Sequence, residues 1–201
     1  MAGYEKLLPL RPEHAVKNLG AKSKICLLSS RDIFRVLRKE KIIVMAANAR
    51  FVHSIPGLMR AAKELDAVIG FELAKSESDL SGGYTGLTPK MHFDAIVESA
   101  EKEKFYLPFF IHADHTTVKD TSEKAVKSAA DLNAEQLRVG YTSFSIDASF
   151  NELEDNIRIT SQLAKPFMNY NVGLEVEVGE ILGLQEGGHI VAAFSLEELL
   201  Q

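Results

Sequence analysis

Short apolar runs alternate with helical segments along most of this chain, and this alternation restricts the fold to a small set of architectures. The apolar runs, which are typical of buried strands, cover residues 42–47, 67–73, 106–110, 143–147 and 172–178. The helical patterns cover residues 30–39, 54–65, 90–104, 120–132 and 151–167. Strands that alternate with helices indicate βαβ units and a parallel sheet. Two architectures fit this pattern, an open doubly wound sheet and a (β/α)₈ barrel.

Polar residues at the ends of the runs favour the barrel. The third, fourth and fifth runs end in or near Asp114, His115, Asp147 and Glu177. Barrel active sites are built from side chains at the carboxyl ends of the strands. The first run is not followed by Gly-x-Gly-x-x-Gly, which disfavours a dinucleotide-binding sheet. We therefore expect a TIM (β/α)₈-type barrel that is incomplete, because about five of its eight βα units are present.

The cluster His112-Ala113-Asp114-His115 is the main chemical signal in the chain. Neutral imidazole is a common zinc ligand, and a nearby carboxylate can transfer protons. On a regular strand His112 and Asp114 share one face and His115 takes the other. If the backbone turns at the strand end, Asp114 and His115 can reach one pocket. A strand end with solvated polar residues gives the same pattern, so the cluster alone leaves both interpretations open.

Composition excludes several classes of protein. The chain has 201 residues and a net charge of −5, which argues against nucleic acid or an anionic membrane as the main partner. Cys26 is the single cysteine, so no internal disulfide can form, in keeping with a reducing compartment. No run is long enough for a membrane span, and the N-terminus lacks a signal-peptide core. We expect a cytoplasmic protein with an N-terminal extension, residues 1–28, and a barrel domain, residues 29–201.

A polar loop between Lys75 and Lys90 is long for a compact domain. Loops of this length are often lids or binding loops. Its Gly82-Gly83 pair would allow close approach to a phosphate, although isolated glycines are a weak signal. Outside the loop, His14 and His92 are expected at the protein surface.

Three motifs, in the order in which they occur, resemble the class II zinc-dependent ketose-bisphosphate aldolases, such as the fructose- and tagatose-bisphosphate aldolases. They are His112-Ala113-Asp114-His115, Ser145-Ile146-Asp147-Ala148-Ser149 and Glu175-Val176-Glu177-Val178-Gly179. The resemblance implies that Asp114 is the catalytic acid/base and that His115 is one of three zinc-binding histidines. It also implies that Asp147 and Glu177 approach the metal in an alternative position.

Asn48 resembles the asparagine of a Phe-Asn strand end that contacts substrate in this family. Here Ala47 replaces the aromatic residue, and Arg50 stands where a second asparagine is expected.

The resemblance implies a lyase of carbohydrate metabolism, such as glycolysis. Its reaction would be the zinc-dependent, reversible cleavage of fructose or tagatose 1,6-bisphosphate to dihydroxyacetone phosphate and glyceraldehyde 3-phosphate. A zinc cofactor, a sugar-phosphate substrate and a homo-oligomer follow from the same resemblance. No lysine lies in the third to fifth runs, which argues against a Schiff-base mechanism.

The chain also departs from the family pattern, because the second and third zinc histidines of the family lie on later strands. His189 is the only later histidine, and its surroundings match neither ligand motif. His53, near the end of the first run, is the other candidate, and His112 is expected to have a supporting or core role. The alternative is therefore a C-terminally truncated, catalytically inactive aldolase fragment or subunit that lacks the full zinc site.

Overall fold

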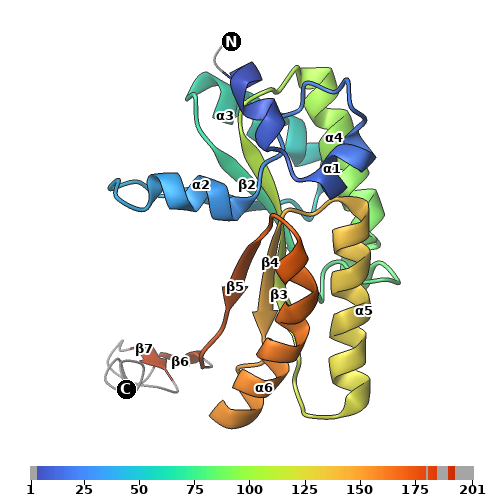
Figure 1. Cartoon of the computed structure of the whole chain (residues 1–201), viewed down its shortest axis with the longest axis vertical. Helices are drawn as coiled ribbons and strands as arrows, with labels where there is room; N and C mark the ends of the chain where they lie inside the picture. Colours follow the sequence, from blue (N-terminus) through green and yellow to red (C-terminus); the bar gives the residue numbers. More distant parts are fainter. Residues whose placement is uncertain (1–3, 180, 185–189, 193–201) are drawn as a thin grey trace.

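The computed structural model describes residues 4–179, 181–184 and 190–192 (Figure 1). Its centre is a sheet of five strands, β1 (Met45–Asn48), β2 (Ile69–Ala74), β3 (Phe109–Thr117), β4 (Ser143–Asp147) and β5 (Gly173–Val176). Neighbouring strands are parallel and follow the order β1-β2-β3-β4-β5. A doubly wound sheet reverses its order at a switch point, whereas a barrel places each strand beside its predecessor. The expectation of a partial TIM-type barrel is therefore confirmed.

Helices connect these strands. They are α3 (Ile55–Glu64), α4 (Pro89–Glu103), α5 (Glu123–Val139) and α6 (Leu153–Ala164), with α1 (Glu13–Leu19) and α2 (Ser30–Leu37) before β1. Short 3₁₀ turns occur as η1 (Tyr4–Leu10), η2 (Val52–Ser54), η3 (Gly83–Thr85) and η4 (Lys165–Asn169). A separate antiparallel pair joins β6 (Ile181–Leu184) and β7 (Ile190–Ala192). None of the described helices combines the length and the hydrophobicity that a membrane span requires.

The outer face of the sheet forms the main hydrophobic core with α3 to α6. Alternate residues of each strand point to this face, as the twofold period of a strand requires. Phe71, Ile111 and Phe144 are each fully buried there. Burial of one such side chain contributes about 1.5–3 kcal/mol, so the apolar runs specify which face of the sheet meets the helices.

The inner face is apolar only at the amino ends of the strands. There α2 packs across the sheet, and the Phe34 and Phe110 rings are 5.7 Å apart in an edge-to-face arrangement. Gly70 leaves room for the Phe110 ring, because a Cβ at that position would lie 2.5 Å from the ring as it is placed here. The carboxyl half of the inner face is left for polar side chains.

The described part of the N-terminal extension is tied to the sheet. Leu28 N donates to Phe109 O at 2.9 Å, and Phe109 N donates to Cys26 O at 3.1 Å. In α1, His14 is buried and its Nε2 lies 2.8 Å from Tyr141 O. The division at residue 28 stays a prediction, but residues 25–28 pack as part of the sheet.

Two histidines expected at the surface are buried, and those expectations were wrong. The His14 ring of α1 packs against the Tyr170 ring, and His92 of α4 is fully buried with its Nδ1 2.8 Å from the Tyr141 hydroxyl. Burial lowers the pKa of His92 to about 3, so the ring is neutral. Both rings contact Tyr141, His14 at its backbone oxygen and His92 at its hydroxyl. Helical periodicity within one segment does not reveal such contacts between segments.

Gly140 provides a test of this packing. It follows α5 with φ +114°, and a Cβ there would lie 2.7 Å from the Phe93 ring. Gly140→Ala is expected to lower the free energy of unfolding by about 2–4 kcal/mol, through left-handed backbone strain and overpacking. The control is Gly57→Ala in α3, where a Cβ meets nothing within 4 Å. Urea denaturation measures both variants, and equal stability of the two would contradict the packing described.

Candidate active site

A β-bulge in β3 creates the candidate site. His112 pairs with Ser143 and Ala113 with Phe144, but the next paired residue of β3 is Thr116, which faces Ile146. Asp114 and His115 thus lie opposite the single residue between Phe144 and Ile146. His115 has φ +40°, an unusual conformation for a residue other than glycine. The bulge turns His115 toward the inner face, beside Asp114, as a strand-end turn was expected to do.

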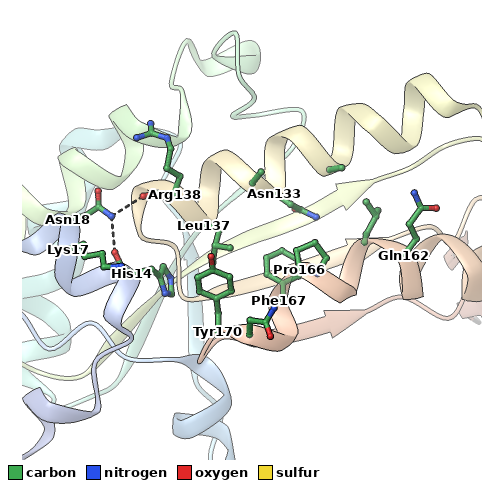
Figure 2. Close-up of a pocket in the computed structure, with 14 residues that line it drawn as sticks. His14, Lys17, Asn18, Asn133, Leu137, Arg138, Gln162, Pro166, Phe167 and Tyr170 are labelled. Carbon is green, nitrogen blue, oxygen red and sulfur yellow. Dashed lines mark hydrogen bonds between the residues drawn. The ribbon is translucent and has the colours of Figure 1, made fainter.

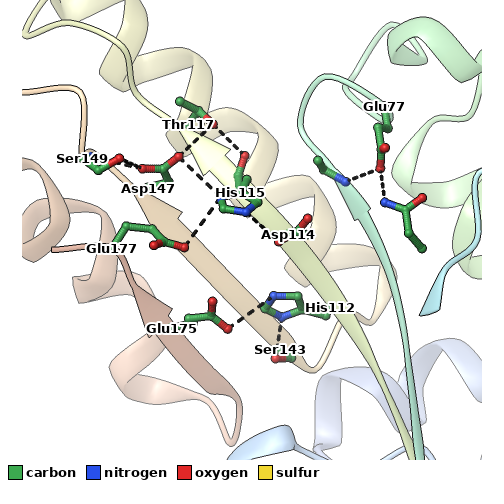
Figure 3. Close-up of polar contacts among 12 residues, drawn as sticks. Glu77, His112, Asp114, His115, Thr117, Ser143, Asp147, Ser149, Glu175 and Glu177 are labelled. Carbon is green, nitrogen blue, oxygen red and sulfur yellow. Dashed lines mark hydrogen bonds and ion pairs between the residues drawn. The ribbon is translucent and has the colours of Figure 1, made fainter. Parts of the chain in front are cut away.

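Three carboxylates surround the His115 ring (Figure 3). Its Nδ1 lies 3.5 Å from Asp147 Oδ2 and 3.6 Å from Glu177 Oε1. On the other edge of the ring, Nε2 lies 3.6 Å from Asp114 Oδ1. Residues from β3, β4 and the end of β5 therefore converge at one edge of the sheet, as the strand-end positions predicted.

Neighbouring groups hold these carboxylates in place. Asp147 is buried, and its Oδ1 accepts hydrogen bonds from the backbone N and the Oγ of Ser149. Thr117 Oγ1 donates to the second oxygen of Asp147 at 3.3 Å. Beside Glu177, Asn156 Nδ2 of α6 donates to the backbone O of that residue at 2.9 Å. The cluster is thus supported from β3, β4 and α6.

The electrostatics of the cluster favour a bound cation. Burial raises the pKa of Asp114 and of Glu177 above their usual values. Burial alone would lower the pKa of His115, but the three carboxylates around it outweigh that effect and raise it. A positive charge would relieve the mutual repulsion of these acidic groups.

Two separations between possible ligand atoms, both from the His115 ring, are short enough for one metal ion to reach both atoms of each pair. In a tetrahedral site with bonds of about 2.1 Å, the ligand atoms lie about 3.4 Å apart. The distances from His115 Nδ1 to Asp147 and Glu177, 3.5 and 3.6 Å, are close to this value. Asp114 lies at the other ring nitrogen.

In the described part of the chain, the possible metal ligands whose atoms are all mutually close lie deeper on the inner face. One ligand atom each of Glu72, His112 and Asp114 all lie within 4.8 Å of one another. His112 is buried, with Nδ1 2.7 Å from Ser143 Oγ, and burial lowers its pKa to about 4. Burial raises the pKa of Glu72 to about 7, with a contribution from Asp114.

Sequence reasoning gave His112 a supporting or core role and missed Glu72. One signal in the sequence could have found Glu72, because it is the single carboxylate in the apolar run 67–73 and lies on the same face of the sheet as His112. Only the strand register, in which Glu72 pairs with His112, shows that the two are neighbours.

Two other candidates, Asn48 and His53, lie outside this cluster. Asn48, at the end of β1, donates a hydrogen bond to Glu77 and accepts one from Arg50. His53 is exposed in η2, and its ring packs against Phe51 with centroids 5.0 Å apart. His189 lies outside the described residues. All the functional roles assigned to candidate residues stay predictions.

The more voluminous of two cavities lies away from the His115 cluster. A cavity of about 770 Å³ lies between α1, α5, α6 and η4, with His14, Asn133 and Tyr170 in its wall (Figure 2). That position is on the helix side of the sheet. A smaller hollow of about 440 Å³ is lined by His115, Lys75 and Lys119. The convergence of His115 with three carboxylates therefore locates the candidate site, although the larger cavity is elsewhere.

The strands are parallel and follow one another in sequence order, and a histidine and carboxylates lie at their carboxyl ends. These features identify an α/β-barrel protein with a candidate metal centre. The sequence model described as "Fructose-bisphosphate aldolase class-II" matches residues 28–197. The chain therefore belongs to the class II fructose-bisphosphate aldolase family, as the resemblance indicated.

Individual relatives agree with this assignment. A fructose-bisphosphate aldolase of Giardia intestinalis is 28% identical over 160 residues, which cover 80% of this chain and 44% of the relative. A 6-phospho-5-dehydro-2-deoxy-D-gluconate aldolase of Halalkalibacterium halodurans is 24% identical over 163 residues, covering 81% and 51%. The chain thus spans about half the length of these two curated relatives. The structure of the YdjI aldolase from Escherichia coli K12 is similar in fold, with a TM-score of 0.60, 19% identity and coverage of 79% and 54%.

Zinc binding tests the role of His115. We expect His115→Ala to weaken zinc binding by at least about tenfold, because it removes the nitrogen that faces Asp147 and Glu177. His53→Ala should bind zinc as the unsubstituted chain does, since its ring packs against Phe51 outside the cluster. Competition with a chromophoric chelator gives the affinities, and metal analysis after dialysis gives the stoichiometry. Equal affinity of the His115→Ala and unsubstituted chains would contradict the assignment.

Proposed function

We propose that this chain catalyses the zinc-dependent, reversible aldol cleavage of a ketose 1,6-bisphosphate, either fructose or tagatose 1,6-bisphosphate. The products would be dihydroxyacetone phosphate and glyceraldehyde 3-phosphate. The observation that carries the proposal is the bulge of β3, which brings Asp114 beside His115 at the carboxyl edge of the sheet. A cytoplasmic location and a homo-oligomer belong to the same proposal.

Asp114 is the acid/base of the proposed reaction. In cleavage its carboxylate takes the proton of the C4 hydroxyl, the C4 carbonyl forms, and the bond between C3 and C4 breaks. The electron pair of that bond stays on the ketose fragment, which takes up a proton from water at C3 to become dihydroxyacetone phosphate. In condensation Asp114 returns the proton to the oxygen on C4. Burial raises the pKa of Asp114, which brings it closer to the operating pH and favours transfer in both directions.

His115, Asp147 and Glu177 form the cation-binding part of the site. A divalent cation held there would supply positive charge against the negative charge that cleavage leaves on the ketose fragment. His115 contributes a nitrogen ligand, and the two carboxylates contribute oxygens on the same side of its ring. Asp147 is further oriented by Ser149, so its position does not depend on the cation.

A catalytically inactive aldolase fragment or subunit is the second candidate function. In the described part of the chain, His115 is the one histidine that faces Asp147 and Glu177, whereas the family resemblance implies three histidine ligands. Absence of turnover in the folded, zinc-loaded chain would favour this candidate.

Substitution of the acid/base tests the proposed mechanism. Asp114→Asn keeps the shape of the side chain and removes its proton-accepting oxygen. We expect kcat for cleavage to fall by at least about 100-fold, while zinc stoichiometry is retained. The control is Asp131→Asn on α5, where the carboxylate pairs with Lys127 at 2.8 Å, away from the cluster. Turnover in Asp114→Asn comparable to that of the control would rule out this role.

Removal and restoration of the metal tests the cofactor. We expect a chelator to abolish cleavage of fructose and tagatose 1,6-bisphosphate, and added zinc to restore it, because the negative charge on the ketose fragment requires a cation. A coupled assay for dihydroxyacetone phosphate measures the rates, and their ratio identifies the preferred substrate. Cleavage that persists in the metal-free chain would disprove zinc dependence.

A further inference from the structure

A buried carboxylate organises the long loop after β2, and the proposed function gives it no role. Glu77 is 5% exposed and lies beside the carboxyl ends of β1 and β2. Its Oε2 accepts from Asn48 Nδ2 at 2.7 Å and from Ala74 N at 2.9 Å, as Figure 3 shows on the β2 side of the site. Its Oε1 accepts from the Tyr84 hydroxyl at 2.8 Å and pairs with Arg50 Nε at 3.2 Å. Both oxygens are therefore engaged from three separate segments of the chain.

The loop itself is folded closely around Glu77. Thr85 Oγ1 donates to Glu77 O at 2.6 Å, and Tyr84 N donates to Ser76 O at 3.0 Å. Gly83 has φ +56°, and a Cβ there would lie 2.4 Å from the Glu77 carbonyl carbon. Only glycine permits this approach, so Gly83 serves the packing of Glu77, whereas Gly82 makes room for the backbone of Gly86.

Arg50 is the group that this network orients. Its Nε donates to Asn48 Oδ1 at 2.8 Å, and its Nη1 donates to the Tyr84 hydroxyl at 3.2 Å. A guanidinium has five N–H donors, and no described protein group accepts from Nη2. The side chain is 57% exposed, so the free edge of the guanidinium is accessible to a ligand.

Arg50 follows the last residue of β1 by two positions, so it lies at the same carboxyl edge of the sheet as His115, Asp147 and Glu177. Asn48 pairs with Glu72, which pairs with His112, so β1 and β3 are separated by two interstrand spacings. Two such spacings amount to about 10 Å, a length that an acyclic sugar phosphate can span. Arg50 lies on the β1 side of Asp114, whereas Asp147 and Glu177 lie on the β4 and β5 side.

We infer that Arg50, held in place by Glu77 through Asn48 and Tyr84, binds the phosphate of the substrate fragment that is released as the aldehyde. This inference rests on the proposed function for the identity of the substrate. The ketose fragment occupies the side of His115, Asp147 and Glu177, so the remaining phosphate extends toward β1. A planar, fixed guanidinium suits a phosphate because two parallel N–H bonds can reach two of its oxygens.

Glu77 acts here as a positioning residue. The negative charge of Glu77 cancels much of the long-range electric field of Arg50. Phosphate binding therefore depends on hydrogen bonds from the oriented N–H groups of Arg50 rather than on long-range attraction. Orientation of the guanidinium is therefore decisive, and Glu77 and Tyr84 supply it from the side that the ligand does not use.

Phosphate binding measured without turnover tests the inference. We expect Arg50→Gln to weaken the binding of inorganic phosphate and of glycerol 3-phosphate about tenfold or more, measured by calorimetry on the 201-residue chain. Arg60→Gln is the matched control, because Arg60 is similarly exposed, 62%, and is paired with Glu103 away from the site. Equal binding by Arg50→Gln and the control would overturn the inference.

Kinetics separate positioning from a structural role. Tyr84→Phe and Glu77→Gln should raise KM for the bisphosphate severalfold or more with little change in kcat, while circular dichroism and the melting temperature verify that each variant is folded. A fall in kcat with unchanged KM in the folded Tyr84→Phe variant would overturn the positioning role, even if Glu77→Gln does not fold. Arg50-dependent phosphate binding without cleavage would reject the aldolase proposal alone. Cleavage with a KM that does not depend on Arg50 would reject this inference alone.

Discussion

The bulge in β3 is the constraint on which the candidate site depends. Regular pleating would direct Asp114 and His115 to opposite faces of the sheet. The left-handed backbone at His115 costs of the order of 1–2 kcal/mol, and the pairing of β3 with β4 on both sides of the bulge compensates for it. Val118 N, for example, donates to Asp147 O at 2.7 Å. The sheet thus holds a strained residue at the edge where the proposed metal ligand and the proposed acid/base lie side by side.

The two faces of the sheet have opposite chemical character. The outer face buries side chains such as Phe71 and Phe144 against helices and provides most of the core. The inner face is apolar near Phe110 and acidic toward the carboxyl ends, where burial raises the pKa of Glu72 and Asp114. A rigid outer core allows these acidic groups to be held close together, and their repulsion favours a cation. The family assignment and the geometry therefore support the same kind of site by independent arguments.

Much of the fold could be predicted from the chain alone because its apolar runs are short, regular and separated by helical patterns. The run at 143–147 coincides with β4, and the helical segment at 90–104 lies within one residue of α4 at each end. The surface positions expected for His14 and His92 were wrong, since Tyr141 lies far from both along the chain and approaches them only in the fold. Glu77 was missed for the same reason.

The sequence by itself determined the succession of strands and helices, the cluster from His112 to His115, and the family to which the chain belongs. These are properties of residue type and local spacing. The tertiary structure alone decided that His115 turns to the side of Asp114, that Glu72 faces His112, and that Glu77 orients Arg50. The reason is physical: strand register and burial are set by packing between segments far apart in the chain, and the charge on a buried carboxylate is stable only beside partners that this packing supplies.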